Sequence, residues 1–270
     1  MRYPASIAPG TRFEEAASLP RHAFDPNDEA RAGDVWRAFQ ELAVHASTAV
    51  GWPPMRYREA GTAFVVRQMS VVHHRRLTYG HDYRGQTWVR RLRRGTLSTR
   101  ELVLLDGEGD EVVRSSQEWV HVDKSQKPCR GRDELVNAFT PLEEGQSVVM
   151  PEFEAKDLGA EHVFTFNVWH TWMDPLGHVN HPAYLDFCDE ALARALRAAG
   201  ADPEIAPLAE SVTFYSSLLA DEDARVRTRC IGEGADGALV FDHIVERNDG
   251  ERCAQARTFR RGAGLECAFV

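Results

Sequence analysis

The stretch Asp174–Tyr184, which reads DPLGHVNHPAY, joins a strand-like segment to a strongly helical one. It holds an acid, a glycine, two histidines, an asparagine and a proline within eleven residues. The apolar residues that follow recur at the i, i+4, i+7 and i+8 spacing of one buried helix face. Taken alone, the stretch has two interpretations: a polar capping turn before a helix, or a reaction centre at the start of that helix.

The same turn and helix occur once before in the chain. Moving the sequence by 149 residues places Asp25 on Asp174 and Gly51 on Gly200 without a gap, together with the apolar stripe between them. Both stripes end at a glycine, the residue that commonly ends a helix in a left-handed conformation. An internal repeat of this length indicates two copies of one structural unit.

In each copy a strand precedes the helix, and strand-like segments separated by turn residues follow it. The second copy continues after its helix with ESVTFYSSLL, ARVRTRCI, ALVFDHIVER and RCAQARTFRRG. A long helix against an antiparallel meander is an α+β layout. We therefore predict two domains, residues 1–145 and 146–270, and we interpret the acidic segment 140–162 between the copies as a linker.

The composition argues against several classes of protein. The chain has 270 residues, of which 32 are basic and 41 acidic, and its net charge of −9 disfavours nucleic acid and anionic membranes as partners. No apolar run is long enough to span a bilayer, and the first residues lack the apolar core of a secretory signal. Five widely spaced cysteines without a C-x-x-C pair predict reduced thiols and a cytoplasmic location.

One basic cluster stands against the acidic balance, and it consists of Arg90, Arg91, Arg93 and Arg94. One interpretation of this cluster is a solvated strand and turn. The other is a contact site for a phosphorylated carrier.

Other motifs give no support to a bound nucleotide or metal. The stretch GEGADG at residues 232–237 matches a dinucleotide-binding pattern, but it lies between two strand-like segments, which predicts a hairpin turn. His170, His178 and His181 have the spacing of neither one helix face nor a zinc finger. We therefore expect neither a metal nor a redox cofactor.

The physical logic of the Asp174 stretch favours a reaction centre. Asp174 ends a strand just before a helix, so its carboxylate can attack an acyl carbon or activate a water near the positive helix end. We expect the amides of residues 177–182, the proline excepted, to be unsatisfied donors for a developing oxyanion. Gly177 allows an acyl group to approach the backbone, and His178 and Asn180 can orient the reacting groups.

The first copy serves as a control for this interpretation. It reads NDEARA at residues 27–32 where the second copy reads LGHVNH at residues 176–181. The fold therefore does not require the glycine, histidines and asparagine of the second copy, which indicates a single working site. Because Asp25 keeps the aspartate, Asp174 alone is not diagnostic.

The residues DPLGHVNHPAYLDFCDEA resemble the signature of the 4-hydroxybenzoyl-CoA thioesterase-like branch of the hotdog superfamily. Two fused copies resemble the double hotdog of fatty acyl-ACP thioesterases and some bacterial acyl-CoA thioesterases. The resemblance implies a tandem hotdog fold and hydrolysis of acyl-CoA or acyl-ACP thioesters. By position it implies a catalytic set of Asp174, His178 and Asn180 and a substrate-binding or oxyanion set of Gly177, His181 and Tyr184.

One position departs from the plant-type acyl-ACP enzymes, which carry an asparagine where this chain has Leu176. Hotdog sites form between two units, so the resemblance implies that the first copy supplies part of the pocket, with Glu41, His73 and His74 as candidates. Two other functions stay open: a hotdog hydratase or dehydratase of acyl thioesters, and an inactive acyl-CoA-binding protein. The acyl chain, the choice between CoA and ACP, and homodimer formation through exposed sheet edges also stay open.

Overall fold

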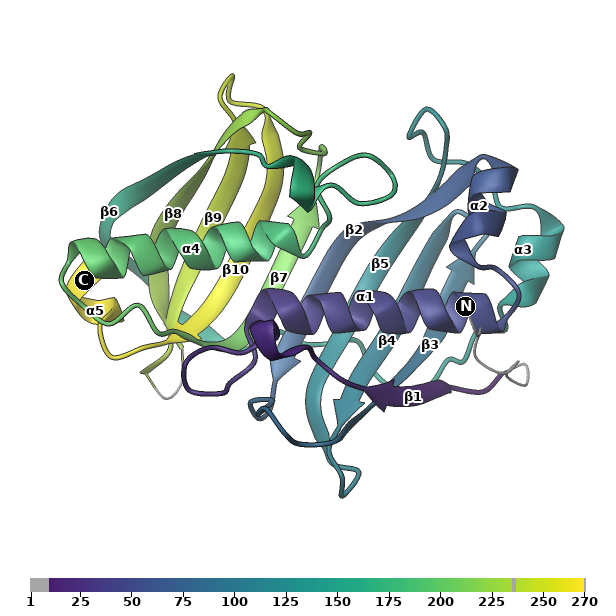
Figure 1. Ribbon diagram of the computed structural model, residues 1–270, viewed down its shortest axis with the longest axis horizontal. Coiled ribbons are helices and arrows are strands. Elements are labelled where there is room, and N and C mark those ends of the chain that lie inside the picture. Colours follow the sequence, from purple (N-terminus) through teal and green to yellow (C-terminus); the bar gives the residue numbers. More distant parts are fainter. Residues whose placement is uncertain (1–9, 235–236, 270) are drawn as a thin grey trace. The chain divides into compact units, whose positions relative to one another are not determined.

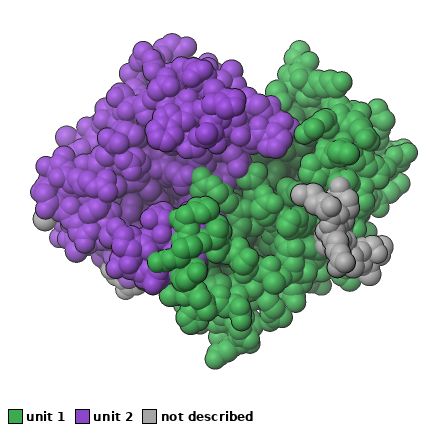
Figure 2. Space-filling view, in the orientation of Figure 1, with its two compact units in different colours: residues 1–22, 35–148 green, residues 23–34, 149–270 purple. Residues whose placement is uncertain are grey.

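The computed structural model describes residues 10–234 and 237–269. The chain divides into two compact units, residues 1–22 with 35–148 (unit 1) and residues 23–34 with 149–270 (unit 2), as Figure 2 shows in two colours. In each unit a long helix lies across one face of an antiparallel sheet (Figure 1). The predicted α+β class is confirmed.

Unit 1 is built around helix α1 (Ala32–Ala49), the helix predicted from the first apolar stripe. Its strands are, in sheet order, β1 (Phe13–Ala17), β3 (Tyr83–Arg93), β4 (Leu97–Leu105), β5 (Glu111–Asp123) and β2 (Thr62–His73). Two short helices, α2 (Pro54–Ala60) and α3 (Asp133–Ala138), complete it, and a 3-10 turn, η1 (Arg21–Ala23), precedes α1. Trp36 and Phe39 of α1 are fully buried, so the stripe packs on the sheet as predicted.

Unit 2 repeats this plan around helix α4 (Ala183–Ala198). Its strands are, in sheet order, β7 (Ala206–Phe214), β10 (Arg252–Arg261), β9 (Leu239–Arg247), β8 (Asp223–Gly234) and β6 (Phe153–Asn167). A 3-10 turn, η2 (His170–Trp172), precedes α4, and a short helix, α5 (Leu265–Phe269), follows β10. When each strand is matched to its counterpart, the strand order is the same in both units, which confirms the repeat.

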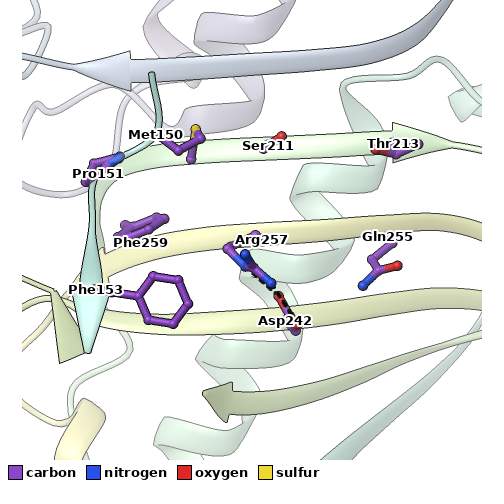
Figure 3. Close-up of a pocket in the computed structure, with 9 residues that line it drawn as sticks. All are labelled: Met150, Pro151, Phe153, Ser211, Thr213, Asp242, Gln255, Arg257 and Phe259. Atoms are coloured by element: carbon purple, nitrogen blue, oxygen red, sulfur yellow. Dashed lines mark hydrogen bonds and ion pairs between the residues drawn. The ribbon is translucent and has the colours of Figure 1, made fainter. Parts of the chain in front are cut away.

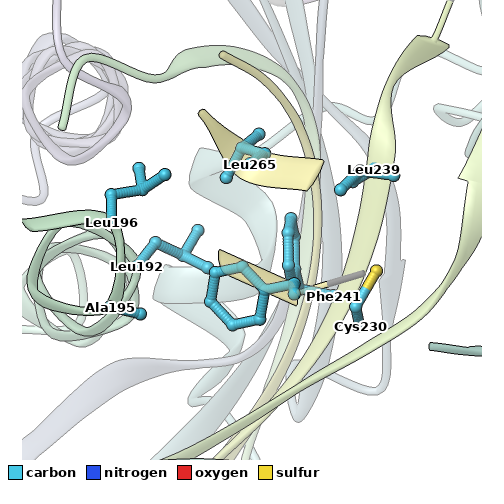
Figure 4. Close-up of a cluster of buried hydrophobic side chains, with 8 residues drawn as sticks. Leu192, Ala195, Leu196, Cys230, Leu239, Phe241 and Leu265 are labelled. Atoms are coloured by element: carbon cyan, nitrogen blue, oxygen red, sulfur yellow. The ribbon is translucent and has the colours of Figure 1, made fainter. Parts of the chain in front are cut away.

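The core of unit 2 lies between α4 and its sheet (Figure 4). Leu192, Ala195 and Leu196 of the helix pack against Phe241 of β9 and Leu265 of α5. Burying one such leucine or phenylalanine side chain stabilises the fold by about 1.5–3 kcal/mol. The α4 stripe is buried as predicted except at its last member, Ala199, which is exposed because the helix has ended by then.

The segment interpreted as a linker is partly strand, because β6 begins at Phe153. Its pairing with β8 runs from Phe153 to Asn167 but shifts register twice. Gly159 lies in this stretch with a φ of +75°, and a Cβ there would lie 2.4 Å from the backbone oxygen of Phe269. These irregularities interrupt the alternation of apolar and polar residues, so the strand has no clear period in the sequence.

Three smaller expectations concern loops, thiols and membranes. The glycine-rich stretch 232–237 joins β8 to β9 as predicted, although residues 235–236 lie outside the described chain. The thiols of Cys129, Cys188, Cys230 and Cys253 are free, as expected, and the side chain of Cys267 lies outside the description. No helix in residues 10–234 or 237–269 is long and apolar enough to cross a membrane.

Candidate active site

The Asp174 stretch forms a backbone-paired loop ahead of the helix. The Asp174 N–H donates to the His178 carbonyl at 2.8 Å, and the Gly177 N–H donates to the Asp174 carbonyl at 3.0 Å. Helix α4 begins only at Ala183, with Pro182 as the residue before it. The loop therefore holds its own shape through backbone hydrogen bonds.

The first copy forms the same loop at Asp25. The Asp25 N–H donates to the Glu29 carbonyl at 2.8 Å, and the Asp28 N–H donates to the Asp25 carbonyl at 3.1 Å. Asp28 has a φ of 61° and its counterpart Gly177 a φ of 82°, so both loops need a left-handed residue here. A Cβ at Gly177 would meet nothing within 4 Å. The conformation at Gly177 thus belongs to the fold, and it is not special to the second copy.

The two loops differ in how the aspartate carboxylate is held. Asp25 Oδ1 accepts two amide N–H groups, two and four residues further on, at 2.8 and 2.9 Å. Within the described part of the chain, Asp174 Oδ1 accepts one amide, that of Leu176, at 2.7 Å. The amide four residues on, that of His178, is not bonded to it. The second loop therefore keeps a carboxylate oxygen and a nearby N–H available for a ligand.

The expected row of unsatisfied amides at residues 177–182 is wrong for most of its members. The acceptors are the carbonyls of Asp174 for Gly177, Leu218 for Val179 and Trp172 for Asn180. These bonds exist because the loop pairs with its neighbours before α4 begins. Of the amides from residue 176 to residue 180, that of His178 is the one without an acceptor among the described residues.

The His178 ring lies beside the carboxylate. Its Nδ1 is 3.3 Å from the Val179 carbonyl oxygen, to which it can donate, and 3.6 Å from Asp174 Oδ1. The side chains of His178 and Asp174 are 16% and 11% exposed, so both are largely withdrawn from water. A neutral ring that donates through Nδ1 keeps Nε2 as an acceptor. The structure thus brings together the two ionisable side chains of the predicted catalytic set, Asp174 and His178.

Tyr184 supports the loop from below. Its ring is 3% exposed, and its Oη accepts the Leu218 N–H at 2.8 Å. Burial raises the pKa of Tyr184 well above its ordinary value. Because Leu218 in turn accepts the Val179 N–H, Tyr184 ties the β7–β8 connection to the Asp174 loop. The structure therefore buries Tyr184 in the core, and its place in the substrate-binding set stays a prediction.

The other two predicted polar residues, Asn180 and His181, are half-buried at the entrance to α4. The His181 ring lies edge-on to Phe214 of β7, with ring centroids 6.0 Å apart.

An aromatic surface beside the loop is absent from the predicted set. Trp169 and Trp172 flank η2 and stack with centroids 5.0 Å apart, and Trp169 is 63% exposed. Leu176, within the loop, is 45% exposed. Exposed apolar surface of this kind can hold an acyl chain. The signal in the sequence was the pair of tryptophans three residues apart, which place two rings on one side of a single helical turn.

Two family models match the chain over most of its length. The model described as the acyl-ACP thioesterase N-terminal domain matches residues 10–139, and that described as the thioesterase-like superfamily matches residues 168–265, which include the Asp174 loop. Neither model alone spans half of the chain, but together they identify it as an acyl thioesterase. It is therefore a thioester hydrolase, as the family resemblance of the Asp174 stretch implies.

Solved thioesterase structures share the fold of this thioesterase. It is similar to a putative oleoyl thioesterase from Lactobacillus plantarum, with a TM-score of 0.79 and 16% identity over 93% of this chain and 96% of that chain. It is also similar to the 12:0-ACP thioesterase from Umbellularia californica, with a TM-score of 0.75 and 17% identity over 93% and 94%. At such identities the likeness concerns the fold alone, and it confirms the tandem hotdog. A search of curated proteins finds no significant match.

Glu41 and His74, two of the residues predicted to reach the substrate pocket from the first copy, interact with other side chains of unit 1. Glu41 is exposed and faces His45, with its Oε2 3.8 Å from Nε2. His74 Nε2 is 3.2 Å from Glu111 Oε1. In the described chain no group of three or more His, Cys, Asp and Glu side chains is arranged to hold a metal ion.

The basic cluster divides into one bound and three exposed arginines. Arg90 lies 3.2 Å from Glu101 and donates to Ser147 Oγ at 2.6 Å. The exposed members, at the end of β3 and in the turn to β4, are Arg91, Arg93 and Arg94.

A cavity of about 230 Å³ in unit 2 is separate from the Asp174 loop (Figure 3). Its lining includes Ser211 of β7, Phe153 of β6 and an ion pair in which Arg257 lies 2.9 Å from Asp242. Asp242 follows Phe241, which packs beneath α4, so its side chain points to the opposite face of the sheet. No residue of the Asp174 loop lines this cavity, and we assign the chemistry to the loop.

Proposed function

We propose that this chain hydrolyses acyl thioesters carried by an acyl carrier protein, with Asp174 as the general base. The observation that carries the proposal is the difference between the two loops. Asp25 binds two amides of its own loop, whereas Asp174 binds one. The loop at Asp25 thus uses both of these amides to hold its own carboxylate. The equivalent loop at Asp174 leaves the His178 N–H and part of the carboxylate without such a bond.

The chemistry needs two groups on one side of a thioester. Asp174 takes a proton from a water molecule through Oδ2 while Oδ1 stays bound to the Leu176 amide, so the carboxylate does not rotate. The water oxygen bonds to the acyl carbon, and the His178 N–H donates to the oxyanion that forms. The intermediate then expels the carrier thiolate, which takes up the proton held by Asp174. The carboxylic acid that remains releases its own proton to solvent and leaves as the carboxylate.

The rate contributions expected of a general base and of an oxyanion donor support these roles for Asp174 and the His178 N–H. A positioned general base contributes about 10²–10⁴-fold to a rate. One oxyanion donor contributes on the order of 10²–10³-fold. The His178 ring acts as an orienting group, because its Nδ1 lies 3.6 Å from Asp174 Oδ1. Asn180 is assigned the same role from the family resemblance.

The carrier is proposed from the family match and from charge. The model for the acyl-ACP thioesterase N-terminal domain covers unit 1, which carries the exposed arginines at the β3–β4 turn. Acyl carrier proteins are acidic, so these side chains offer a complementary contact. Trp169 and Leu176 would then receive the acyl chain at the loop in unit 2.

The proposal is tested by thiol release from matched panels of acyl-ACP and acyl-CoA substrates. Hydrolysis should be faster with acyl-ACP, and the preference should shrink at high salt and on reversal of the exposed arginine charges. Loss of enoyl-CoA absorbance without released thiol would instead indicate a hydratase. An acyl-enzyme trapped with hydroxylamine would make Asp174 a nucleophile, contrary to the proposal.

A further inference from the structure

The core of unit 1 contains a guanidinium without a carboxylate partner. Arg100 of β4 is 7% exposed, and its hydrogen-bond partner among the described residues is the Thr87 hydroxyl, 3.3 Å from Nη1. Burial lowers the pKa of Arg100 to about 10, and the neighbouring Tyr57 opposes this effect. At neutral pH the side chain is therefore still charged.

A buried charge of this kind is unusual, because buried arginines are normally paired. Arg260 of unit 2 shows the normal arrangement: it is fully buried and lies 2.6 Å from Glu210 and 2.9 Å from Asp189. Leaving a buried ion without its partner is strongly destabilising. Arg100 thus carries a cost that no carboxylate of the described chain offsets.

The second unit shows that the fold does not need an arginine at this position. Phe13 and His162 occupy the same position in the 149-residue repeat. Phe13 pairs with Thr87 of β3, and His162 pairs with Thr228 of β8, so the two threonines are equivalent. Two residues further along each strand, the partner strand holds Arg100 in unit 1 and Phe241 in unit 2. Phe241 is fully buried and fills the space beneath α4 (Figure 4). Unit 1 therefore has the charged side chain of Arg100 at the position where unit 2 has the apolar side chain of Phe241.

A cavity of about 40 Å³ adjoins the Arg100 side chain. Its lining includes Ala46 of α1, Val50 just after that helix and Val89 of β3, so the walls near the helix are apolar. One water needs roughly 10–15 Å³ and benzene fills an engineered cavity of about 150 Å³, so this space suits a group of a few atoms. The Thr87 hydroxyl already donates to the Glu101 carbonyl at 2.9 Å, which leaves the guanidinium as the donor.

We propose that unit 1 binds a carboxylate group in this cavity, held by the guanidinium of Arg100. A guanidinium presents two parallel N–H groups that match the two oxygens of a carboxylate. A carboxylate also supplies the counter-charge that the core lacks, and its size fits the space. The ligand that this site takes is a small free carboxylate such as acetate.

The binding is tested by thermal unfolding of the full chain in sodium acetate against sodium chloride at constant ionic strength. Acetate should raise the Tm of the wild type saturably, and Arg100→Met should abolish this response. Arg100→Phe, which copies unit 2, provides a second variant in case the first does not fold. An equal response of the wild type to acetate and chloride would overturn the proposal.

Discussion

Replacing Tyr184 by phenylalanine removes one buried hydrogen bond beneath the Asp174 loop. The Tyr184 hydroxyl accepts the N–H of Leu218 at 2.8 Å, and Leu218 is fully buried. Phenylalanine keeps the ring and its edge-on contact with Phe214 at 5.4 Å, but the Leu218 N–H loses its acceptor. A buried N–H left unsatisfied costs about 1–3 kcal/mol. The free energy of unfolding, measured in urea by circular dichroism, should fall by that amount.

Tyr57→Phe in unit 1 is the matched control for this substitution. The Tyr57 hydroxyl lies 3.1 Å from Ser47 Oγ, but Ser47 keeps its bond to the Trp52 carbonyl at 3.0 Å. No buried N–H is left without an acceptor, so we expect a loss of at most about 1 kcal/mol. Equal losses for the two variants would refute the reasoning. A raised KM for Tyr184→Phe with unchanged stability would place the hydroxyl against the substrate instead.

Three further predictions concern unit 2. Burial lowers the pKa of His243 from 6.5 to about 3, so below pH 6.5 the unfolded chain binds a proton that the folded chain does not. Stability should then fall by about 1.4 kcal/mol per pH unit down to pH 3, and urea unfolding at pH 7 and pH 5 should show this component lost in His243→Gln; an unchanged difference would contradict it. Gly177→Asn should unfold close to wild type, as Asp28 suggests, whereas Gly177→Val should lose about 1–2 kcal/mol in thermal unfolding. Arg260→Met should lose about 3–5 kcal/mol because the buried Glu210 loses the guanidinium that lies 2.6 Å away, and adding Glu210→Leu should restore most of that loss in urea unfolding.

Much of the fold follows from the 149-residue repeat and the two apolar stripes. Two features depend on tertiary contacts that no local pattern encodes. The first half of β6 is interrupted at Gly159, which hides its alternation. Residues 23–34 group with unit 2, although they belong to the first repeat. One such contact joins Asp25 to Glu204, where burial and the Asp25 carboxylate raise the pKa of Glu204.

The sequence predicted where in the chain the candidate site lies, but it did not predict the hydrogen bonds that the backbone of this loop makes. The residue types pointed to Asp174 and His178, which the structure places side by side. Which backbone amides lack an acceptor depends on the residue at which α4 begins. Local sequence propensity does not predict a helix start to within a few residues. The core position of Tyr184 follows from its contact with Leu218, which is distant in the sequence.

The central claim is that the Asp174 carboxylate, and not that of Asp25, performs the hydrolysis. Asparagine in place of Asp174 keeps an oxygen for the Leu176 amide at 2.7 Å, so the loop should stay folded while the base is lost. Thiol release from an acyl-ACP substrate should show kcat/KM lower by about 10²–10⁴-fold for Asp174→Asn. Asp25→Asn should hydrolyse within a few-fold of wild type. Near wild-type hydrolysis by Asp174→Asn, or an equal loss in Asp25→Asn, would contradict the claim.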